Sequence, residues 1–162
     1  MDTITAARRL HLLDVENLVG HGRPGLHDLH ICCDTYRDLG LLMDHDLVVI
    51  GCNPGPVFDV SACWGNARLV TRHGVDGADL ALLDVLLHEQ VDQRFTEIVL
   101  ASGDGIFADA IADLQGRGVA VTVVAAADSL SRRLRLAAGR IVEFSRPTYP
   151  APAAAQSRAG VA

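Results

Sequence analysis

The chain of 162 residues contains no lysine, and all 14 of its basic side chains are arginine. A Walker-type phosphate loop needs a lysine, so this absence excludes that class of nucleotide site. The segment "DVENLVGHG" (14–22), which follows the first hydrophobic run, also lacks the GxGxxG pattern of dinucleotide-binding domains. A small-molecule, nucleotide-binding or phosphotransfer domain is therefore the weakest interpretation of this sequence.

Long hydrophobic runs are also missing. No apolar stretch approaches the roughly 18–20 residues that cross a bilayer, and "MDTITAARRL" (1–10) lacks the apolar core of a secretory signal. We therefore expect a soluble, cytoplasmic protein with no membrane partner. The four cysteines form no CxxC pair and the seven histidines follow no zinc-site spacing. A zinc centre is accordingly set aside.

The net charge of −6 argues against tight, nonspecific binding to duplex nucleic acid, which depends on releasing counterions from phosphates. It does not exclude nucleic acid as a substrate. Carboxylates that surround a metal site contribute negative charge, and a bound Mg²⁺ or Mn²⁺ cancels that charge locally.

Short apolar runs, rich in Val, Ile and Leu, recur along the chain. They are nearly continuous rather than alternating, which is typical of parallel strands covered on both faces. The predicted strands are 9–15, 45–51, 67–71, 97–102, 119–125 and a last short one at 140–145.

Segments with helical periodicity lie between these runs, at 25–40, 76–91, 105–118 and 128–140, and one helical turn is expected from Val57. Alternating strands and helices predict an α/β fold: a three-layer α/β/α sandwich with a mostly parallel central sheet. We expect one domain over residues 1–146, followed by a flexible Pro/Ala-rich tail over residues 147–162.

Carboxylates follow three of the predicted strands. Asp14 ends the first strand, Asp79 lies in the first turn of the helix after the third, and Asp104 follows the fourth. Ligands bind at the carboxyl edge of such sheets, and converging carboxylates repel one another unless protonated or bridged by a cation. Hard oxygen ligands suit Mg²⁺ or Mn²⁺, which can activate a water for in-line attack on a phosphodiester.

Several alternatives stay open at this site. Asp76 or Asp84 could replace Asp79, although Asp84 lies about 140° around the helix from it, so the two cannot face one ion. Asn17 either orients a water or phosphate oxygen or caps the next turn. Ser102 and Asp104 either serve the site or cap the helix that follows.

A group of arginines lies on or just after the last predicted helix. Its members are Arg132, Arg133 and Arg135, with Arg140 nearby. One interpretation is a solvated helix face with cations near the helix C-terminus; the other is a surface that binds the backbone of a nucleic acid.

Taken in order, three segments resemble the NYN domain, a branch of the PIN-like ribonuclease fold: "LLDVENL" (12–18), "GVDGADLALLDVLL" (74–87) and "VLASGDGIFADAIADLQGRGVAVTVV" (99–124). The resemblance spans most of residues 10–125. It implies a Rossmann-like fold and a divalent-metal-dependent endoribonuclease acting on RNA. Asp14, Asp79 and Asp104 would correspond to the metal-binding acids of the family, and Asn17 and Ser102 to its adjoining polar positions.

The chain departs from the family at one position. Many relatives read Ser-Gly-Asp-x-Asp-Phe where this sequence has Ile106 in place of the second acid. Asp109 lies some 60° away from the direction of the missing carboxylate, which makes it a doubtful substitute. The alternative function is thus a catalytically weak or inactive domain that binds RNA or a protein partner. The number of metal ions and a homodimer are left open.

Overall fold

The structure, a computed structural model, describes residues 8–148. Within this range the chain forms six strands, seven α-helices and one 3₁₀-helix. The strands are β1 (Arg9–Asp14), β2 (Leu47–Cys52), β3 (Arg68–Thr71), β4 (Glu97–Ala101), β5 (Ala120–Ala126) and β6 (Arg140–Phe144). The helices are α1 (Val15–Val19), α2 (Leu26–Asp38), α3 (Val57–Trp64), α4 (Gly77–His88), α5 (Val91–Arg94), η1 (Gly105–Phe107), α6 (Ala108–Gly116) and α7 (Arg132–Ala137).

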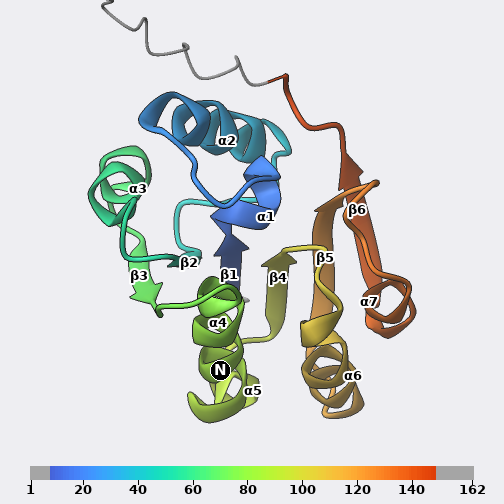
Figure 1. The fold of residues 1–162 in the computed structure, drawn as a ribbon. Helices are drawn as coiled ribbons and strands as arrows, with labels where there is room; N and C mark the ends of the chain where they lie inside the picture. The colour runs from blue at the N-terminus through green and yellow to red at the C-terminus, as the bar shows by residue number, and fades with distance from the viewer. Residues whose placement is uncertain (1–7, 149–162) are drawn as a thin grey trace, which may run out of the picture.

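The six strands form one parallel sheet in the order β3-β2-β1-β4-β5-β6 (Figure 1). Strand order reverses between β1 and β4, the place where open α/β sheets bind ligands. The chain beyond Asp14 and the chain beyond Ala101 therefore leave adjacent strands at this reversal. The predicted parallel sheet is confirmed.

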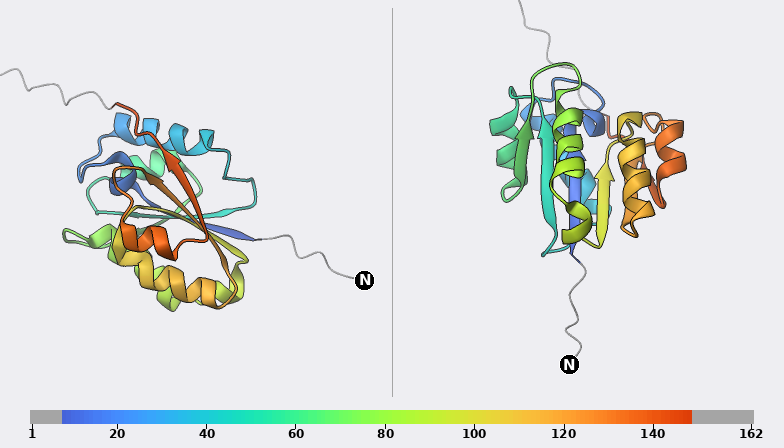
Figure 2. Two further views of the ribbon diagram at one scale, coloured as in Figure 1. Left: turned by 90° about the vertical axis from the view of Figure 1, so that its right-hand side faces the viewer. Right: turned by 90° about the horizontal axis from the view of Figure 1, so that it is seen from below.

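Helices cover both faces of the sheet, as the edge-on view in Figure 2 shows. One buried cluster joins α1, α2 and α3 to the sheet, and a second joins α4, α5, α6 and α7 to its other face. Both faces of the central strands are thus removed from water, which explains their continuous apolar sequence. The three-layer α/β/α sandwich is confirmed.

Three local features differ from the prediction. Helix α1 begins directly after β1 and was not predicted, because five residues are too few to show a helical period. Helix α3 extends over eight residues, where a single turn was expected. Helix α7 begins at Arg132 and not at residue 128, because Ser131 is its N-cap, with a hydroxyl that accepts from the backbone N–H of Leu134.

No helix within residues 8–148 is both long enough and apolar enough to cross a membrane. The predicted tail (147–162) falls almost wholly outside the described residues, so the boundary at residue 146 stays a prediction.

Candidate active site

Asp14 is both the last residue of β1 and the N-cap residue of α1. Its carboxylate is the N-cap of the helix, with Oδ1 accepting from the backbone N–H of Asn17 at 3.1 Å. Its other oxygen, Oδ2, accepts from the hydroxyl of Ser102 at 3.1 Å. Asp14 is only 3% exposed. The two hydrogen bonds fix a buried carboxylate at the reversal of strand order.

Asp79 lies beside Asp14, although it comes from the helix that follows β3. It occupies the first turn of α4, which packs closely on β2 because Gly51 has no side chain. A Cβ at Gly51 would stand 2.8 Å from the carbonyl oxygen of Ala78 and 2.6 Å from Cγ of Leu82. The missing side chain therefore lets the start of α4 approach the carboxyl edge of the sheet.

The two aspartates depend on each other for their protonation. Burial raises the pKa of Asp14 above its ordinary value. Burial, and after it the hydrogen bond and charge of Asp14, raises the pKa of Asp79 to about 8. The Oδ1 atom of Asp79 is buried, and no N–H or O–H group among residues 8–148 donates to it. This oxygen needs either a proton shared with Asp14 or a cation.

Asp104 follows β4 and faces the same pair. Its negative charge contributes to raising the pKa of both Asp14 and Asp79. Its Oδ1 accepts from the backbone N–H of Ile106 at 2.9 Å, so it also caps η1. Its own backbone N–H donates to the Ser102 hydroxyl at 3.2 Å. The capping role and the site role thus belong to the same side chain.

Asn17 connects the turns that follow three strands. Its Oδ1 accepts from the backbone N–H of Gly103 at 2.9 Å and from the hydroxyl of Ser129 at 3.5 Å. The carbonyl end of the amide is therefore occupied by the protein itself. The oxygen holds the turn after β4, a role that neither of the two predictions for Asn17 included.

Among the alternatives to Asp79, neither Asp76 nor Asp84 occupies the same place. Asp76 is the exposed N-cap residue of α4, close enough that its charge adds to the raised pKa of Asp79. Asp84 points to solvent and pairs with Arg72 at 3.6 Å and with His88 at 3.7 Å. Only Asp79 adjoins Asp14.

Glu16 and Asn53 form a pair at this edge that sequence reasoning missed. Asn53 donates to the Glu16 carboxylate through its backbone N–H at 3.0 Å and through Nδ2 at 2.7 and 2.9 Å. Their positions carry a signal: each comes just after one of two adjacent strands, β1 and β2. The pair joins the start of α1 to the loop that leads into α3.

The donor set fits a hard divalent cation through two carboxylates. Asp14 and Asp79 present adjacent oxygens, one of them buried without a donor. Within residues 8–148, no group of three or more His, Cys, Asp or Glu side chains is arranged to hold a metal ion. Mg²⁺ commonly binds through one or two carboxylates and completes its shell with waters and substrate phosphates. Asp14 and Asp79 supply the two carboxylates that such a Mg²⁺ site needs.

An apolar side chain, Ile106, occupies the position where the second acid is missing. Ile106 is half-buried and contacts the core cluster on the α4–α7 side. Asp109 does not replace it, since its side chain is 90% exposed and accepts from Arg133 at 2.9 Å. The described site therefore lacks a carboxylate where many NYN relatives have one.

The arginines of α7 are partly neutralised. Arg133 pairs with Asp109, and Arg135 pairs with Glu143 on β6. Arg132 is exposed. The predicted nucleic-acid surface stays a prediction, and two of its three guanidinium groups already have acidic partners.

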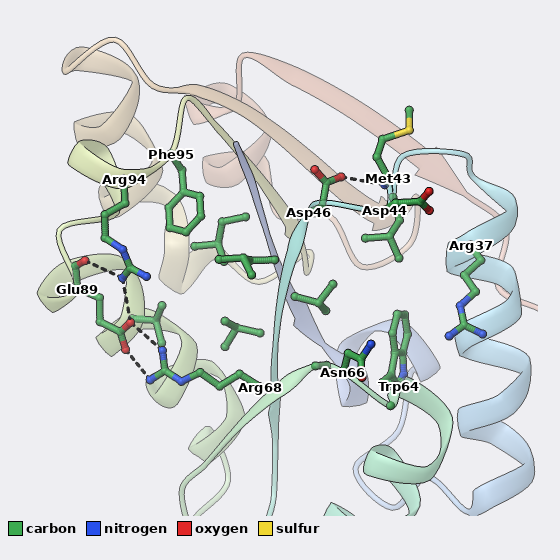
Figure 3. Close-up of a pocket in the computed structure, with 18 residues that line it drawn as sticks. Arg37, Met43, Asp44, Asp46, Trp64, Asn66, Arg68, Glu89, Arg94 and Phe95 are labelled. Carbon is green, nitrogen blue, oxygen red and sulfur yellow. Dashed lines mark hydrogen bonds and ion pairs between the residues drawn. The ribbon is translucent and has the colours of Figure 1, made fainter. Parts of the chain in front are cut away.

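A pocket of about 690 Å³ lies at the opposite edge of the sheet, where β1, β2 and β3 begin (Figure 3). An ion-pair cluster forms one wall, in which Arg68 and Arg94 both bind Glu89. Trp64 lines the pocket, with the guanidinium of Arg37 5.7 Å from its ring centre. None of the predicted site residues lines this pocket. The pocket and the Asp14–Asp79 pair therefore lie at opposite edges of the sheet.

Residues 68–145 match the family model of the NYN domain. The chain contains an NYN domain. NYN domains belong to the PIN-like nuclease superfamily, so the predicted family is confirmed. The match includes Asp79, Ser102 and Asp104, whereas Asp14 and Asn17 precede it and are brought to the same edge by the fold.

A comparison of structures agrees with this fold. The crystal structure of a protein of unknown function from Vibrio parahaemolyticus RIMD 2210633 is similar, with a TM-score of 0.58 and 17% sequence identity. The similarity covers 90% of this chain and 97% of that one. At this identity it bears on the fold alone. The comparison with curated proteins gave no match.

Proposed function

We propose that this NYN domain is a divalent-metal-dependent endoribonuclease that hydrolyses RNA phosphodiesters. NYN domains are typically ribonucleases, which supports a nuclease as the broad class. The observation that carries the proposal is the contact between Asp14 and Asp79, which leaves the buried Oδ1 of Asp79 without a donor. A buried acid in contact with a half-buried one destabilises a fold, and such arrangements cluster at functional sites.

In this proposal, Asp14 and Asp79 hold Mg²⁺ or Mn²⁺ together with Asp104, whose negative charge already acts on both. When bound, the ion supplies a water of lowered pKa as nucleophile and neutralises charge on the leaving oxygen. Ser102 holds Asp14 in one orientation through its hydroxyl. Asn17 holds the turn that carries Asp104, and its amide nitrogen, which donates to no residue of the described chain, is available to a phosphate oxygen.

The proposal is tested by incubating the purified protein with Mn²⁺ or Mg²⁺ and a mixed pool of end-labelled single-stranded RNA. We expect internal cleavage that EDTA abolishes. Asp14→Asn and Asp79→Asn should each reduce the rate about 100-fold or more, in the range seen when metal-binding or charge-stabilising groups are removed. A circular RNA distinguishes internal from terminal cleavage, because it offers no end.

The matched control is Asp84→Asn. Asp84 lies on the same helix as Asp79 but is exposed and bound to Arg72, so its substitution should leave the rate unchanged. An intact RNA pool under all metal conditions would overturn the proposal. Metal binding is measured separately as a rise in melting temperature, since a ligand that binds only the folded state stabilises it.

The alternative function is a catalytically weak or inactive domain that binds RNA or a protein partner. The half-buried Ile106 favours it, because the usual acid is replaced by a side chain that packs on the core. Retained RNA binding without cleavage would support this alternative. Loss of that binding in a variant with Arg132, Arg133 and Arg135 changed to Ala would identify α7 as the binding surface. A cytoplasmic location and a homodimer stay predictions.

A further inference from the structure

Arg146 lies beyond the last strand and reaches back across the sheet edge to α1. Its Nη2 donates to the backbone carbonyl of Asn17 at 2.8 Å and its Nε to that of Leu18 at 3.3 Å. Its Nη1 donates to Asp128 at 2.7 Å. Figure 1 shows the chain leaving β6 on the side of the sheet that α1 and α2 cover. The guanidinium thus joins α1 to the turn after β5.

Helix α1 depends on contacts from outside the helix for its stability. It contains only five residues, too few to be stable on its own, and the last carbonyl groups of a helix have no partner within it. A guanidinium at this end satisfies two of them and complements the negative end of the helix dipole. Gly20 provides the space for this guanidinium, because a Cβ there would stand 2.9 Å from Nε of Arg146. Its φ of 93° also favours glycine.

The same two elements are joined a second time by Asn17. The backbone carbonyl of Asn17 accepts from Arg146, while its side-chain oxygen accepts from Gly103 and Ser129. Ser129 belongs to the turn that carries Asp128, the acidic partner of Arg146. A Cβ at Gly103 would stand 2.3 Å from the carbonyl oxygen of Ser129, so this turn also packs directly on the turn after β4.

We propose that Arg146 is a positioning residue of the candidate active site. By fixing α1 from its C-terminal end, Arg146 sets the position of Asn17, and through the Asn17–Gly103 hydrogen bond it sets the turn that carries Asp104. Asp14, the N-cap of the same helix, is held from the opposite end. The inference deepens the proposed endoribonuclease and rests on it for its consequence in catalysis.

Arg146→Ala frees the carbonyl groups at the end of α1 and breaks the link to Asp128. We expect the backbone amides of Asn17 and Gly103 to exchange with solvent about tenfold faster, because local opening becomes easier. In the cleavage reaction kcat should fall about tenfold or more while KM changes less than twofold, as displacement of a catalytic group predicts. Arg146→Lys should have an intermediate effect, since an ammonium cannot reproduce the planar fork.

The test is hydrogen exchange of the Asn17 and Gly103 amides in the full chain, measured by NMR, together with steady-state cleavage kinetics. Arg117→Ala is the matched control, because Arg117 also pairs with two acids, Asp92 and Asp113, but at a distant surface. Asp128→Asn separates the ion pair from the carbonyl contacts and should change exchange less than Arg146→Ala does.

The outcomes are distinguishable from those of the proposed function. Unchanged exchange in Arg146→Lys and Arg146→Ala overturns the inference, whether or not the protein cleaves RNA. Faster exchange with an unchanged kcat also overturns it, because Arg146 would then be structural only. If the unaltered protein cleaves no RNA, the proposed function fails, and faster exchange at Asn17 and Gly103 still supports the link that Arg146 makes. Should Arg146→Ala not fold, Arg146→Lys carries the test.

Discussion

The carboxylates of Asp14 and Asp79 lie against each other at the reversal of strand order, although 65 residues separate them in the chain. Asp14 is held by Asn17 and Ser102, whereas one oxygen of Asp79 has no donor within residues 8–148. This asymmetry favours Asp79 as the member that carries the proton in the metal-free protein, in line with its raised pKa.

The metal-free protein should lose stability as the pH rises from about 4 to 8. The pKa of Asp79 is raised from 3.8 to about 8, so in this window the folded state binds more protons than the unfolded state. The free energy of unfolding therefore decreases with rising pH. Asp79→Asn removes the ionisable group and should raise the free energy of unfolding at pH 8 by about 1–3 kcal/mol.

Urea denaturation at pH 5 and pH 8 in EDTA measures this difference. Asp84→Asn, on the exposed face of the same helix, should leave the pH dependence as it is. An Asp79→Asn variant less stable than the unaltered protein at pH 8 would contradict the raised pKa. Saturating Mg²⁺ or Mn²⁺ should reverse the trend, because a bound cation favours the ionised pair.

His11 should have the opposite effect on how the free energy of unfolding depends on pH. It is fully buried, its Nε2 donates to Asp46 at 3.1 Å, and its Nδ1 accepts from the hydroxyl of Tyr36 at 2.6 Å. Burial lowers its pKa below 6.5, so the folded state keeps it neutral while the unfolded state takes up a proton. This contribution is complete above pH 6.5 and is lost as the pH falls below it.

The Asp79→Asn background makes the histidine effect easier to see, since it removes the opposing contribution of Asp79 and leaves only that of Asp14. In that background, the free energy of unfolding should decrease from pH 7 to pH 5. His11→Gln should lower stability at pH 7 and flatten this decrease, whereas His88→Gln, at an exposed position, should do neither. A decrease that persists in His11→Gln would assign it to another group.

Gly51→Ala should damage both the fold and the site. The added methyl group would meet the Ala78 carbonyl oxygen at 2.8 Å, so α4 must move away from β2. Overpacking of this kind costs about 1–3 kcal/mol. Because Asp79 lies in the first turn of that helix, cleavage should fall more than the loss of folded protein explains. Gly55→Ala is the control: a Cβ at Gly55 meets no atom within 4 Å.

The sequence predicted the strands and their parallel arrangement well, because the continuous apolar runs of the central strands are buried on both faces. It also placed Asp14 and Asp104 after two strands that the structure shows to be adjacent, and the structure adds that Asp79 lies beside Asp14. It could not predict α1, whose five residues show no period, or the partners of Asn17. Those depend on side chains 86 and 129 residues away, Gly103 and Arg146, and no local pattern records such contacts.

The role of the arginines on α7 was also beyond prediction from sequence. The same sequence pattern is compatible with a solvent-exposed helix face and with a surface that binds nucleic acid. Only the three-dimensional arrangement gives Arg133 and Arg135 their acidic partners, Asp109 and Glu143. Glu143 lies on β6, and its reach to α7 depends on how the helix docks beside that strand.

Ile106→Asp tests how much the missing acid matters. Ile106 is half-buried against the core, so the substitution should lower the free energy of unfolding by about 1–3 kcal/mol. If the absent carboxylate limits metal binding, the same variant should bind Mn²⁺ more tightly and cleave RNA faster despite its lower stability. Ile106→Asn has nearly the same shape as the aspartate without its charge, and it should lose the stability without gaining the activity. Equal rates for the two variants and the unaltered protein, measured at a temperature where all three are folded, would show that Asp14, Asp79 and Asp104 suffice.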